Sequence, residues 1–423
     1  DERIKQLPPA PGVRYFSKGI SSLSQVSGTE RKHILRVLLA CLVGKMDPKG
    51  ITACRSILHF IQLAQYPSHD QDTLKYMKEE LHTWHQYRDY FISEDARIHF
   101  DIPKFHSLLH YVDSIKWIGT TDNTNTEAFE RLHIDFAKEG WRSSNKRDHF
   151  PQMISFINRQ EKVSSFDFYR SWRRLLVKPQ KPEKPERSSV LISLSKYPKE
   201  PKKKLAAISL LHGAPGFLAT LKLFLNDFLP KKRKRGVALG GYLPFRTLEV
   251  WHSFGLIPLK ILDEPDKSLI KAQPLTGKDK PARFDTVIVL EDDRAQSTAV
   301  QGCRAARIRV IFRLPQTVLD KKDSKVEAPP NWPQEPLAYV TWYTRFKSAP
   351  DTATGMYKVE PAVASNGVPQ GAIIPLSNIR QSCMLVPGRA TWDKGWKKDN
   401  VLDECSTFFV NNLQTKYAYQ TIY

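Results

Sequence analysis

Residues 284–292 (FDTVIVLED), 306–314 (ARIRVIFRL) and 337–346 (LAYVTWYTRF) decide the fold of the second half of this 423-residue chain. Each is a short run rich in valine, isoleucine and aromatic residues, and clusters of proline, glycine and aspartate separate the runs. Two shorter runs continue the pattern, at 355–359 (GMYKV) and 372–379 (AIIPLSNI). The pattern predicts an antiparallel, β-rich domain over residues 241–423, built like a barrel or a sandwich.

The first 170 residues have a helical periodicity instead. Ser27 and Glu30 have the spacing of a capping box, and apolar residues then recur at helical intervals as far as Leu42. Further helices are predicted over about 51–65, 70–91, 103–117, 126–139 and 148–161. The helix 70–91 carries one apolar stripe, which we interpret as a packing surface, at Leu74, Met77, Leu81, Trp84 and Phe91. The chain is therefore predicted to be a multidomain α + β protein with a mainly helical half at 1–170.

Residues 171–240 have the composition of a basic, Pro- and Lys-rich linker. They are expected to hold one short strand at 190–194 (VLISL) and a short helical stretch at about 205–229. Residues 171–235 contain 17 lysines and arginines against four acidic residues, so they supply +13 of the chain's formal net charge of +21. Charge localised in this way favours a polyanionic partner, and nucleic acid before any other.

The sequence does not support a disulfide-rich protein, a zinc ribbon, a membrane-spanning protein or an enzyme of several common motif classes. The five cysteines are widely spaced and include no CxxC pair, which favours reduced thiols over a disulfide framework or a zinc ribbon. No run approaches the roughly 18 apolar residues of a membrane span, so no membrane partner is expected. The GxGxxG, GxxxxGK[ST], GxSxG and HExxH motifs are absent.

Two histidines and an aspartate share the predicted helix 103–117. His106 and His110 are four residues apart, and Asp113 follows about one turn later. That spacing puts the three side chains near one face, as a metal or phosphate contact requires. Two histidines without a third ligand are more often structural, and both interpretations stay open.

Two glutamates share one face of the predicted helix 126–139. A carboxylate just inside a helix is stabilised by the helix dipole, and this accounts for one of Glu127 and Glu130 without any functional role. It accounts less well for the second, and a carboxylate presented from a rigid helix is what a magnesium-dependent phosphoryl-transfer site requires. Lys146 and Arg147 follow, and they suit contact with DNA phosphates as well as they suit a solvated surface.

A second basic cluster stands directly after Pro230, at Lys231, Lys232, Arg233, Lys234 and Arg235. It resembles a nuclear localisation signal, and it also suits DNA binding. Reduced cysteines and a DNA partner agree with a nuclear protein, so nuclear localisation is predicted.

Four segments in the helical half carry a family resemblance: 102–110 (IPKFHSLLH), 126–133 (TEAFERLH), 137–140 (AKEG) and 144–150 (SNKRDHF). They resemble transposases of the Kyakuja–Dileera–Zisupton superfamily, and most of all its fungal Plavaka branch. Collinear matches extend the resemblance over nearly the whole chain, at 19–30 (GISSLSQVSGTE), 243–252 (LPFRTLEVWH), 283–290 (RFDTVIVL), 309–315 (RVIFRLP), 335–346 (EPLAYVTWYTRF) and 373–387 (IIPLSNIRQSCMLVP).

The resemblance implies a DDE-type cut-and-paste transposase with an RNase H-like core, which binds double-stranded DNA at the transposon ends. In such enzymes two aspartates on strands and a later glutamate on a helix hold two Mg²⁺ ions. Residues 1–125 would match the helical insertion of that core. Glu130 would then be the catalytic metal ligand, with Glu127 as the alternative, and His106 and His110 would match a His-x-x-x-His element near the site.

One departure from the family pattern limits what this chain is expected to do. In the family the two catalytic aspartates precede the segment that corresponds to Asp1, and the sequence opens at Asp1 rather than at methionine. We therefore expect a C-terminal portion of a transposase that does not cleave DNA alone. The alternative is a non-catalytic, transposon-derived DNA- or chromatin-binding protein. The sequence does not fix the oligomeric state, and a homo-oligomer stays open.

Overall fold

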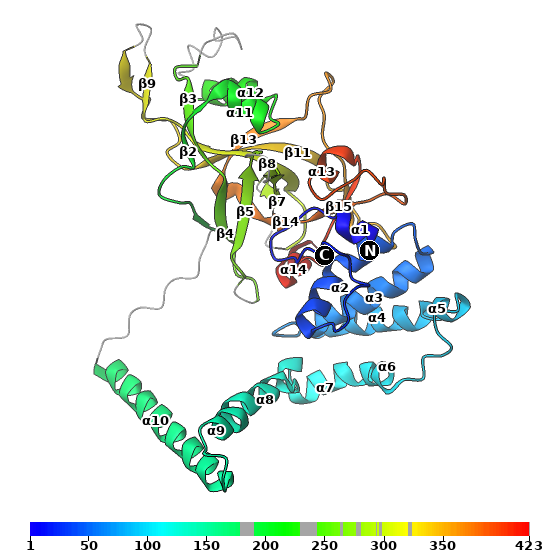
Figure 1. Ribbon diagram of the computed structural model, residues 1–423. Coiled ribbons are helices and arrows are strands. Elements are labelled where there is room, and N and C mark those ends of the chain that lie inside the picture. The colour runs from blue at the N-terminus through cyan, green and yellow to red at the C-terminus, as the bar shows by residue number, and fades with distance from the viewer. Residues whose placement is uncertain are drawn as a thin grey trace. The chain divides into compact units, whose positions relative to one another are not determined.

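The computed structural model describes residues 1–177, 190–228, 243–262, 265–275, 281–292, 294–295, 298–319 and 324–422. The described chain is α + β, and its strands form several antiparallel sheets (Figure 1). It divides into two compact units. Unit 1 contains residues 1–63, 70–109 and 187–423, and unit 2 contains residues 64–69 and 110–186. The first helices therefore belong with the β-rich half, a grouping different from the expected segments 1–170, 171–240 and 241–423.

The N-terminal helices of unit 1 are α1 (Glu2–Gln6), α2 (Gly28–Leu42), α3 (Pro48–Ala64), α4 (Gln71–Tyr87), α5 (Tyr90–Ser93) and α6 (Pro103–Ser107). Helices α2, α3 and α4 lie where the periodicity predicts them, whereas α1 was not predicted and the expected helix 70–91 is divided into α4 and α5. The capping box is confirmed, because Ser27 Oγ accepts from Glu30 N at 3.2 Å and the Glu30 carboxylate accepts from Ser27 N at 3.0 Å. The apolar stripe of α4 is a packing surface, as predicted, with Leu74, Met77, Leu81 and Trp84 buried.

The largest sheet has seven strands: β2 (Glu200–Lys204), β3 (Thr247–Trp251), β7 (Thr286–Leu290), β8 (Cys303–Arg313), β11 (Leu337–Arg345), β13 (Gly371–Pro375) and β14 (Ile379–Cys383). A second sheet contains β1 (Leu191–Ser193), β4 (Ser253–Ile257), β5 (Ser268–Gln273) and β6 (Arg283–Phe284). Shorter sheets are made by β9 (Thr317–Leu319) with β10 (Lys325–Glu327), and by β12 (Tyr357–Val359), β16 (Phe408–Val410) and β15 (Leu385–Pro387).

The expected antiparallel, β-rich architecture is confirmed, but of the two forms expected, barrel or sandwich, the barrel is wrong, since the described strands close no barrel. Strand β8 gives the physical reason. One edge of β8 pairs with β11, and its other edge is divided between two partners. Residues 303–307 pair with β7 and residues 311–313 pair with β3. The sheet therefore forks at β8 instead of curling round to its first strand.

A β-bulge in β8 sets which side chains face which core. Val310 pairs with Tyr339 and Ile308 pairs with Val340, so Arg309 is the extra residue. Val310 and Phe312 enter one core cluster, whereas Ile308 and Ile311 enter another. The strand is therefore buried on both faces, and the bulge shifts its alternation by one residue.

The two faces of the large sheet are covered differently. Helices α11 (Leu205–Leu211) and α12 (Phe217–Asn226) pack against one face through Ile208, Phe217 and Leu221 (Figure 1). The sheet that contains β4 and β5 packs against the other face. Residues 190–228 were expected to be linker with one strand and one helical stretch. They form β1 and two helices in about those positions, but also β2, which was not predicted.

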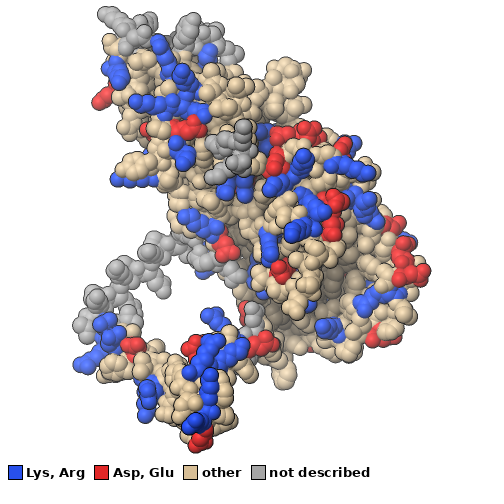
Figure 2. Space-filling view, in the orientation of Figure 1, with Lys and Arg blue, Asp and Glu red and all other residues tan. Residues whose placement is uncertain are grey.

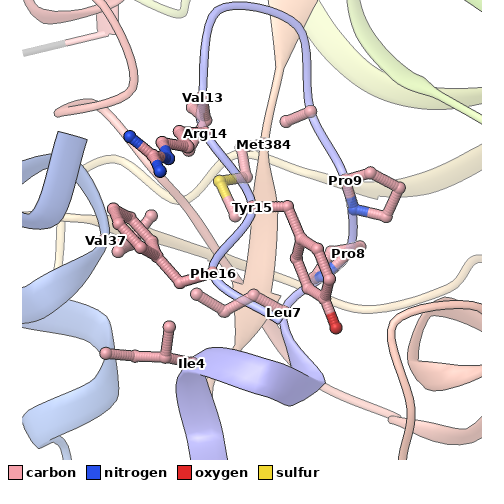
Figure 3. A pocket seen from close by; sticks show the side chains of 11 residues that line it. Ile4, Leu7, Pro8, Pro9, Val13, Arg14, Tyr15, Phe16, Val37 and Met384 are labelled. Atoms are coloured by element: carbon pink, nitrogen blue, oxygen red, sulfur yellow. The ribbon is translucent and has the colours of Figure 1, made fainter. Parts of the chain in front are cut away.

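The N-terminal segment is hydrogen-bonded to, and packs against, the C-terminal part of unit 1. The guanidinium of buried Arg3 donates to the carbonyls of Cys41 (2.9 Å), Val43 and Ala390. Figure 3 shows the adjoining contact, where side chains of the N-terminal segment and α2 meet Met384 around a hollow of only about 10 Å³. Two further helices, α13 (Val401–Glu404) and α14 (Lys416–Ile422), complete this end of the unit.

Unit 2 is a succession of helices. It contains α7 (Tyr111–Ile118), the 3-10 turn η2 (Thr121–Asn123), α8 (Glu127–Leu132), the π-helical turn η3 (His133–Lys138), α9 (Glu139–Arg142) and α10 (His149–Val177). α7 ends at Gly119, whose φ of 96° favours glycine. Thr121 Oγ1 then donates to the carbonyl of Ala64 at 2.7 Å, which fixes the turn that follows.

His212, directly after α11, is fully buried in unit 1. The Arg309 carbonyl can only accept, so Nδ1 of His212, at 2.8 Å from it, carries the proton. Nε2 has no hydrogen-bond partner among the described groups. Burial lowers the pKa of His212 to about 4, and the native state therefore holds a neutral imidazole.

Replacing Arg3 by methionine should lower the free energy of unfolding by about 3 kcal/mol, because three carbonyls lose a charged donor. Urea unfolding followed by circular dichroism measures the change. Arg31→Met, at an exposed position on α2, is the matched control and should stay within about 0.5 kcal/mol of the wild type. Equal stability of the two variants would contradict the role given to Arg3.

The buried His212 should make unit 1 less stable in acid. Its native pKa of about 4 lies below the ordinary 6.5, so the unfolded chain binds a proton that the native chain excludes. The stabilisation is complete above pH 6.5 and is lost as the pH falls to 4, by about 3 kcal/mol. Urea unfolding at pH 7 and pH 4.5 should show a smaller pH dependence for His212→Gln than for the exposed control His82→Gln. An identical pH dependence in both variants would refute this assignment.

Candidate nucleic-acid interface

The predicted glutamate-bearing helix is present in unit 2. α8, η3 and α9 follow one another without a break from Glu127 to Arg142, close to the expected 126–139. Glu130 lies on α8 with an exposed side chain, and its N–H donates to the Thr126 carbonyl at 2.9 Å. Glu127 is the first residue of α8, but its side chain lies outside what the structure describes. The choice between the two carboxylates therefore stays open.

The π-helical turn alters the faces of this helix. In η3 each hydrogen bond spans five residues instead of four, and such turns occur frequently at functional sites. Residues after His133 are therefore rotated relative to the positions that a regular α-helix would give them. The π-helical turn lies between Glu130 on α8 and Glu139, the first residue of α9, so a period of 3.6 residues does not give the angle between these two side chains. No local pattern in the sequence predicted the turn.

The predicted basic residues Lys146 and Arg147 lie exposed in the loop between α9 and α10. The side chain of Gln152 on α10 holds this loop. Its Oε1 accepts from Asn145 N at 3.0 Å, and its Nε2 donates to Asn145 Oδ1 and to the Arg147 carbonyl, both at 2.8 Å. Lys146 has a φ of 64°, a left-handed conformation that is uncommon outside glycine. The loop is thus a built structure that presents two adjacent cations.

α10 extends the basic surface beyond the expected end of the helix at 161. Its exposed cations, which a helical period of 3.6 residues places on one side, are Arg159, Lys162, Arg170, Arg173 and Arg174. An exposed apolar stripe on the opposite side contains Phe150, Ile154, Phe168 and Trp172. The continuing spacing of Phe168 and Trp172 was a signal in the sequence that could have predicted the longer helix.

His106, His110 and Asp113 do not lie on one helix. α6 ends at Ser107, and a 3-10 turn, η1 (Leu108–His110), intervenes before α7 begins. The predicted single helix over 103–117 is therefore wrong, and with it the argument that the three side chains share a face. All three are exposed; His106 belongs to unit 1, whereas His110 and Asp113 belong to unit 2.

The described residues do not make a metal site by themselves. Within the described ranges no three His, Cys, Asp or Glu side chains are grouped so as to hold a metal ion. Mg²⁺ takes six oxygen ligands in octahedral geometry, of which the carboxylate of Glu130 would supply one or two. No catalytic step follows from this carboxylate alone.

Three further features bear on what the sequence led us to expect. The basic cluster Lys231, Lys232, Arg233, Lys234 and Arg235 lies outside the described residues. Among the helices that are described, none is long and apolar enough to cross a membrane. All five cysteines are free thiols, and burial raises the pKa values of Cys41 and Cys383 to about 12, which makes them poor nucleophiles.

Replacing Gln152 by alanine should loosen the basic loop without unfolding unit 2. The Asn145 N–H loses its acceptor, and a hydrogen bond is worth about 1 kcal/mol, so its hydrogen exchange should become about fivefold faster. Gln160→Ala, at an exposed position on the same helix, is the control and should leave Asn145 unchanged. Exchange at Asn145 that is equally slow in both variants would show that Gln152 does not hold the loop.

Comparisons of the chain with protein-family models, with curated proteins and with solved structures found no match. The transposase resemblance therefore stays a prediction made from the sequence.

Proposed function

We propose that this chain is the C-terminal part of a DDE-type cut-and-paste DNA transposase, with an RNase H-like core in the complete enzyme. The observation that carries the proposal is the order of groups in unit 2. A helix with the exposed carboxylate of Glu130 leads into a loop that holds Lys146 and Arg147 outward, and the basic side of α10 follows. A phosphoryl-transfer enzyme acting on DNA needs both kinds of group near the scissile phosphate, and in unit 2 they follow one another along the chain.

The cations would contact the phosphates of double-stranded DNA at the transposon ends. Each ammonium or guanidinium that neutralises a phosphate releases counterions, so affinity depends steeply on salt. Glu130, with Glu127 as the alternative, would be the metal-binding carboxylate, and two aspartates from outside these 423 residues would complete the set. Mg²⁺ bound there would activate water or a 3′-hydroxyl for attack on a phosphate. Without those aspartates the chain would bind DNA and leave it uncut.

The second candidate is a non-catalytic, transposon-derived DNA- or chromatin-binding protein in the nucleus. The excess of positive charge favours it, because +13 of the net +21 lies in residues 171–235 and needs no carboxylate to bind DNA. The two proposals differ in what Glu130 does. In the first it is essential for strand cleavage, and in the second it has no effect on any activity.

Fluorescence anisotropy with duplex DNA across a salt series tests the interface. The double variant Lys146→Gln/Arg147→Gln should bind several-fold more weakly, and the slope of log K against log salt should fall by about 1.8, which corresponds to two lost phosphate contacts. Lys75→Gln/Lys78→Gln on the exposed side of α4 is the matched control and should bind like the wild type. An unchanged slope in the first variant would rule out the loop as the interface.

Glu130→Gln separates the two candidate functions. Duplex affinity should not change in this variant, with or without Mg²⁺, because a single carboxylate binds the ion weakly. In a protein that joins this chain to the two missing aspartates, the same substitution should abolish magnesium-dependent strand cleavage. Cleavage that survives Glu130→Gln and is lost in Glu127→Gln would assign the metal to Glu127. The absence of cleavage in the parent protein would favour the non-catalytic function.

A further inference from the structure

A strip of lysines on unit 1 stands apart from the interface described above. Ser195–Pro198 leads into β2, which lies at one end of the seven-stranded sheet and pairs with β3. Nine residues here, 196–204, contain five lysines and one acid, Glu200. In Figure 2, Lys and Arg side chains gather over the end of unit 1 that carries β2, β3 and α12.

The negative charge of Glu200, the one acid of the strip, is already paired with neighbouring groups. Glu200 Oε1 lies 2.8 Å from Nε2 of His252, and its Oε2 accepts from Lys203 Nζ at 2.5 Å. Burial would raise the pKa of Glu200, but the hydrogen bonds and charges of Lys203 and His252 outweigh it, so the pKa is lowered. Glu200 is therefore ionised and satisfied, and it is not available to the other lysines.

A bulge in β2 separates the paired lysine from the unpaired ones. Glu200 pairs with Val250 and Lys203 pairs with Leu248, so β2 has one residue more than β3 over this interval. Lys203 thus comes to the side of Glu200, and its neighbours Lys202 and Lys204 are exposed. Across the described residues, the lysines that form no ion pair in this strip are Lys196, Lys199, Lys202 and Lys204. They leave a local charge of about +4.

An exposed lysine-rich edge has a simpler explanation, because lysines on edge strands prevent pairing with other chains. That explanation does not account for Tyr197. Tyr197 is 73% exposed near the start of the strip, and Lys196 Nζ lies 5.4 Å from its ring centroid. An aromatic ring set among cations is the combination with which proteins bind single-stranded nucleic acid, since bases stack on the ring while the cations follow the phosphates.

The spacing of the cations fits such a strand. Lys202 and Lys204 are two residues apart on a β-strand, a distance of roughly 6.8 Å. In duplex DNA the phosphates of one strand rise by about 3.4 Å per nucleotide along the axis, and an unstacked single strand is more extended, so neighbouring lysines of the strip can reach neighbouring phosphates. We propose that the strip formed by Tyr197, Lys199, Lys202 and Lys204 binds single-stranded nucleic acid, with one base stacked on Tyr197. This site lies in unit 1 and does not rest on the function proposed for unit 2.

Fluorescence anisotropy on the full chain, with 15-nucleotide oligo(dT), oligo(rU) and a duplex of equal length, tests the proposal. Tyr197→Ala should weaken oligo(dT) binding by at least about fivefold and leave duplex binding unchanged. Tyr197→Phe keeps the ring and should bind like the wild type. Lys199→Gln/Lys202→Gln/Lys204→Gln should lower the salt slope for oligo(dT) by about 2. Equal affinity for oligo(rU) would mean that the site does not distinguish RNA from DNA, as expected for stacking and phosphate contacts.

Two controls keep the result interpretable. Lys49→Gln/Lys75→Gln/Lys78→Gln removes the same charge from exposed positions on α3 and α4 and should leave oligo(dT) binding unchanged. Lys146→Gln/Arg147→Gln should weaken duplex binding alone, so a failure of the unit 2 proposal would be recognised separately. Wild-type affinity of Tyr197→Ala for oligo(dT), in a variant whose circular dichroism matches the parent, would overturn the proposal. An equal loss of duplex and oligo(dT) binding in the β2 triple variant would do the same, because the strip would then be only a general cationic surface.

Discussion

Strand β8 has both faces buried and both edges paired, and the rest of unit 1 is arranged around it. Three hydrophobic core clusters each take side chains from this one strand. Most side chains of β8 are buried, yet the strand contains Arg307, which is buried, and Arg309, which is half-buried. Arg307 is accommodated by Asp403, whose carboxylate accepts from it at 2.6 and 3.1 Å, and Arg309 donates to the same carboxylate at 3.1 Å. Burial opposes ionisation of Asp403, but these two arginines lower its pKa, so the charge stays in place. The half-exposed Asp403 thus pairs with the buried Arg307 and with Arg309, and these bonds fix α13 against the sheet.

Part of this arrangement was accessible from the sequence and part was not. Alternating β-branched and aromatic residues predicted β7, β8 and β11, because a strand's propensity is local. The capping box and the apolar stripe predicted α2 and α4 for the same reason. The fork at β8 was not predictable, since two strands that share one edge have no local signature. The grouping of the first helices with the sheets depends on contacts such as Arg3 to Ala390, which join residues 387 positions apart. Pattern reasoning has no access to such pairs.

The candidate nucleic-acid interface was likewise predictable from the sequence only in part. Residue type alone indicated that Lys146 and Arg147 suit phosphate contact, and they are exposed in a loop fixed by Gln152. Arguments that needed a continuous helix were less successful. A 3-10 turn separates His106 from Asp113, so the face inferred for the histidines does not hold, and a π-helical turn rotates the residues that follow α8, whereas Glu127 and Glu130 both lie within α8. The β2 strip was hidden for another reason. Its Pro- and Lys-rich composition is typical of linkers, and only pairing with β3 reveals it as part of a sheet.

The hydrogen bonds of Arg3 bear on how unit 1 folds during synthesis on the ribosome. The carbonyls of Cys41 and Val43 follow Arg3 by 38 and 40 residues on the ribosome, whereas the third carbonyl, that of Ala390, follows it by 387 residues. At about 5–20 residues per second the interval is on the order of tens of seconds. During that time the first helices of unit 1 have no final partner, whereas the helices of unit 2 have only local contacts to form. Folding of unit 1 is therefore a late and non-local event, of the kind that proceeds slowly and exposes apolar surface to chaperones.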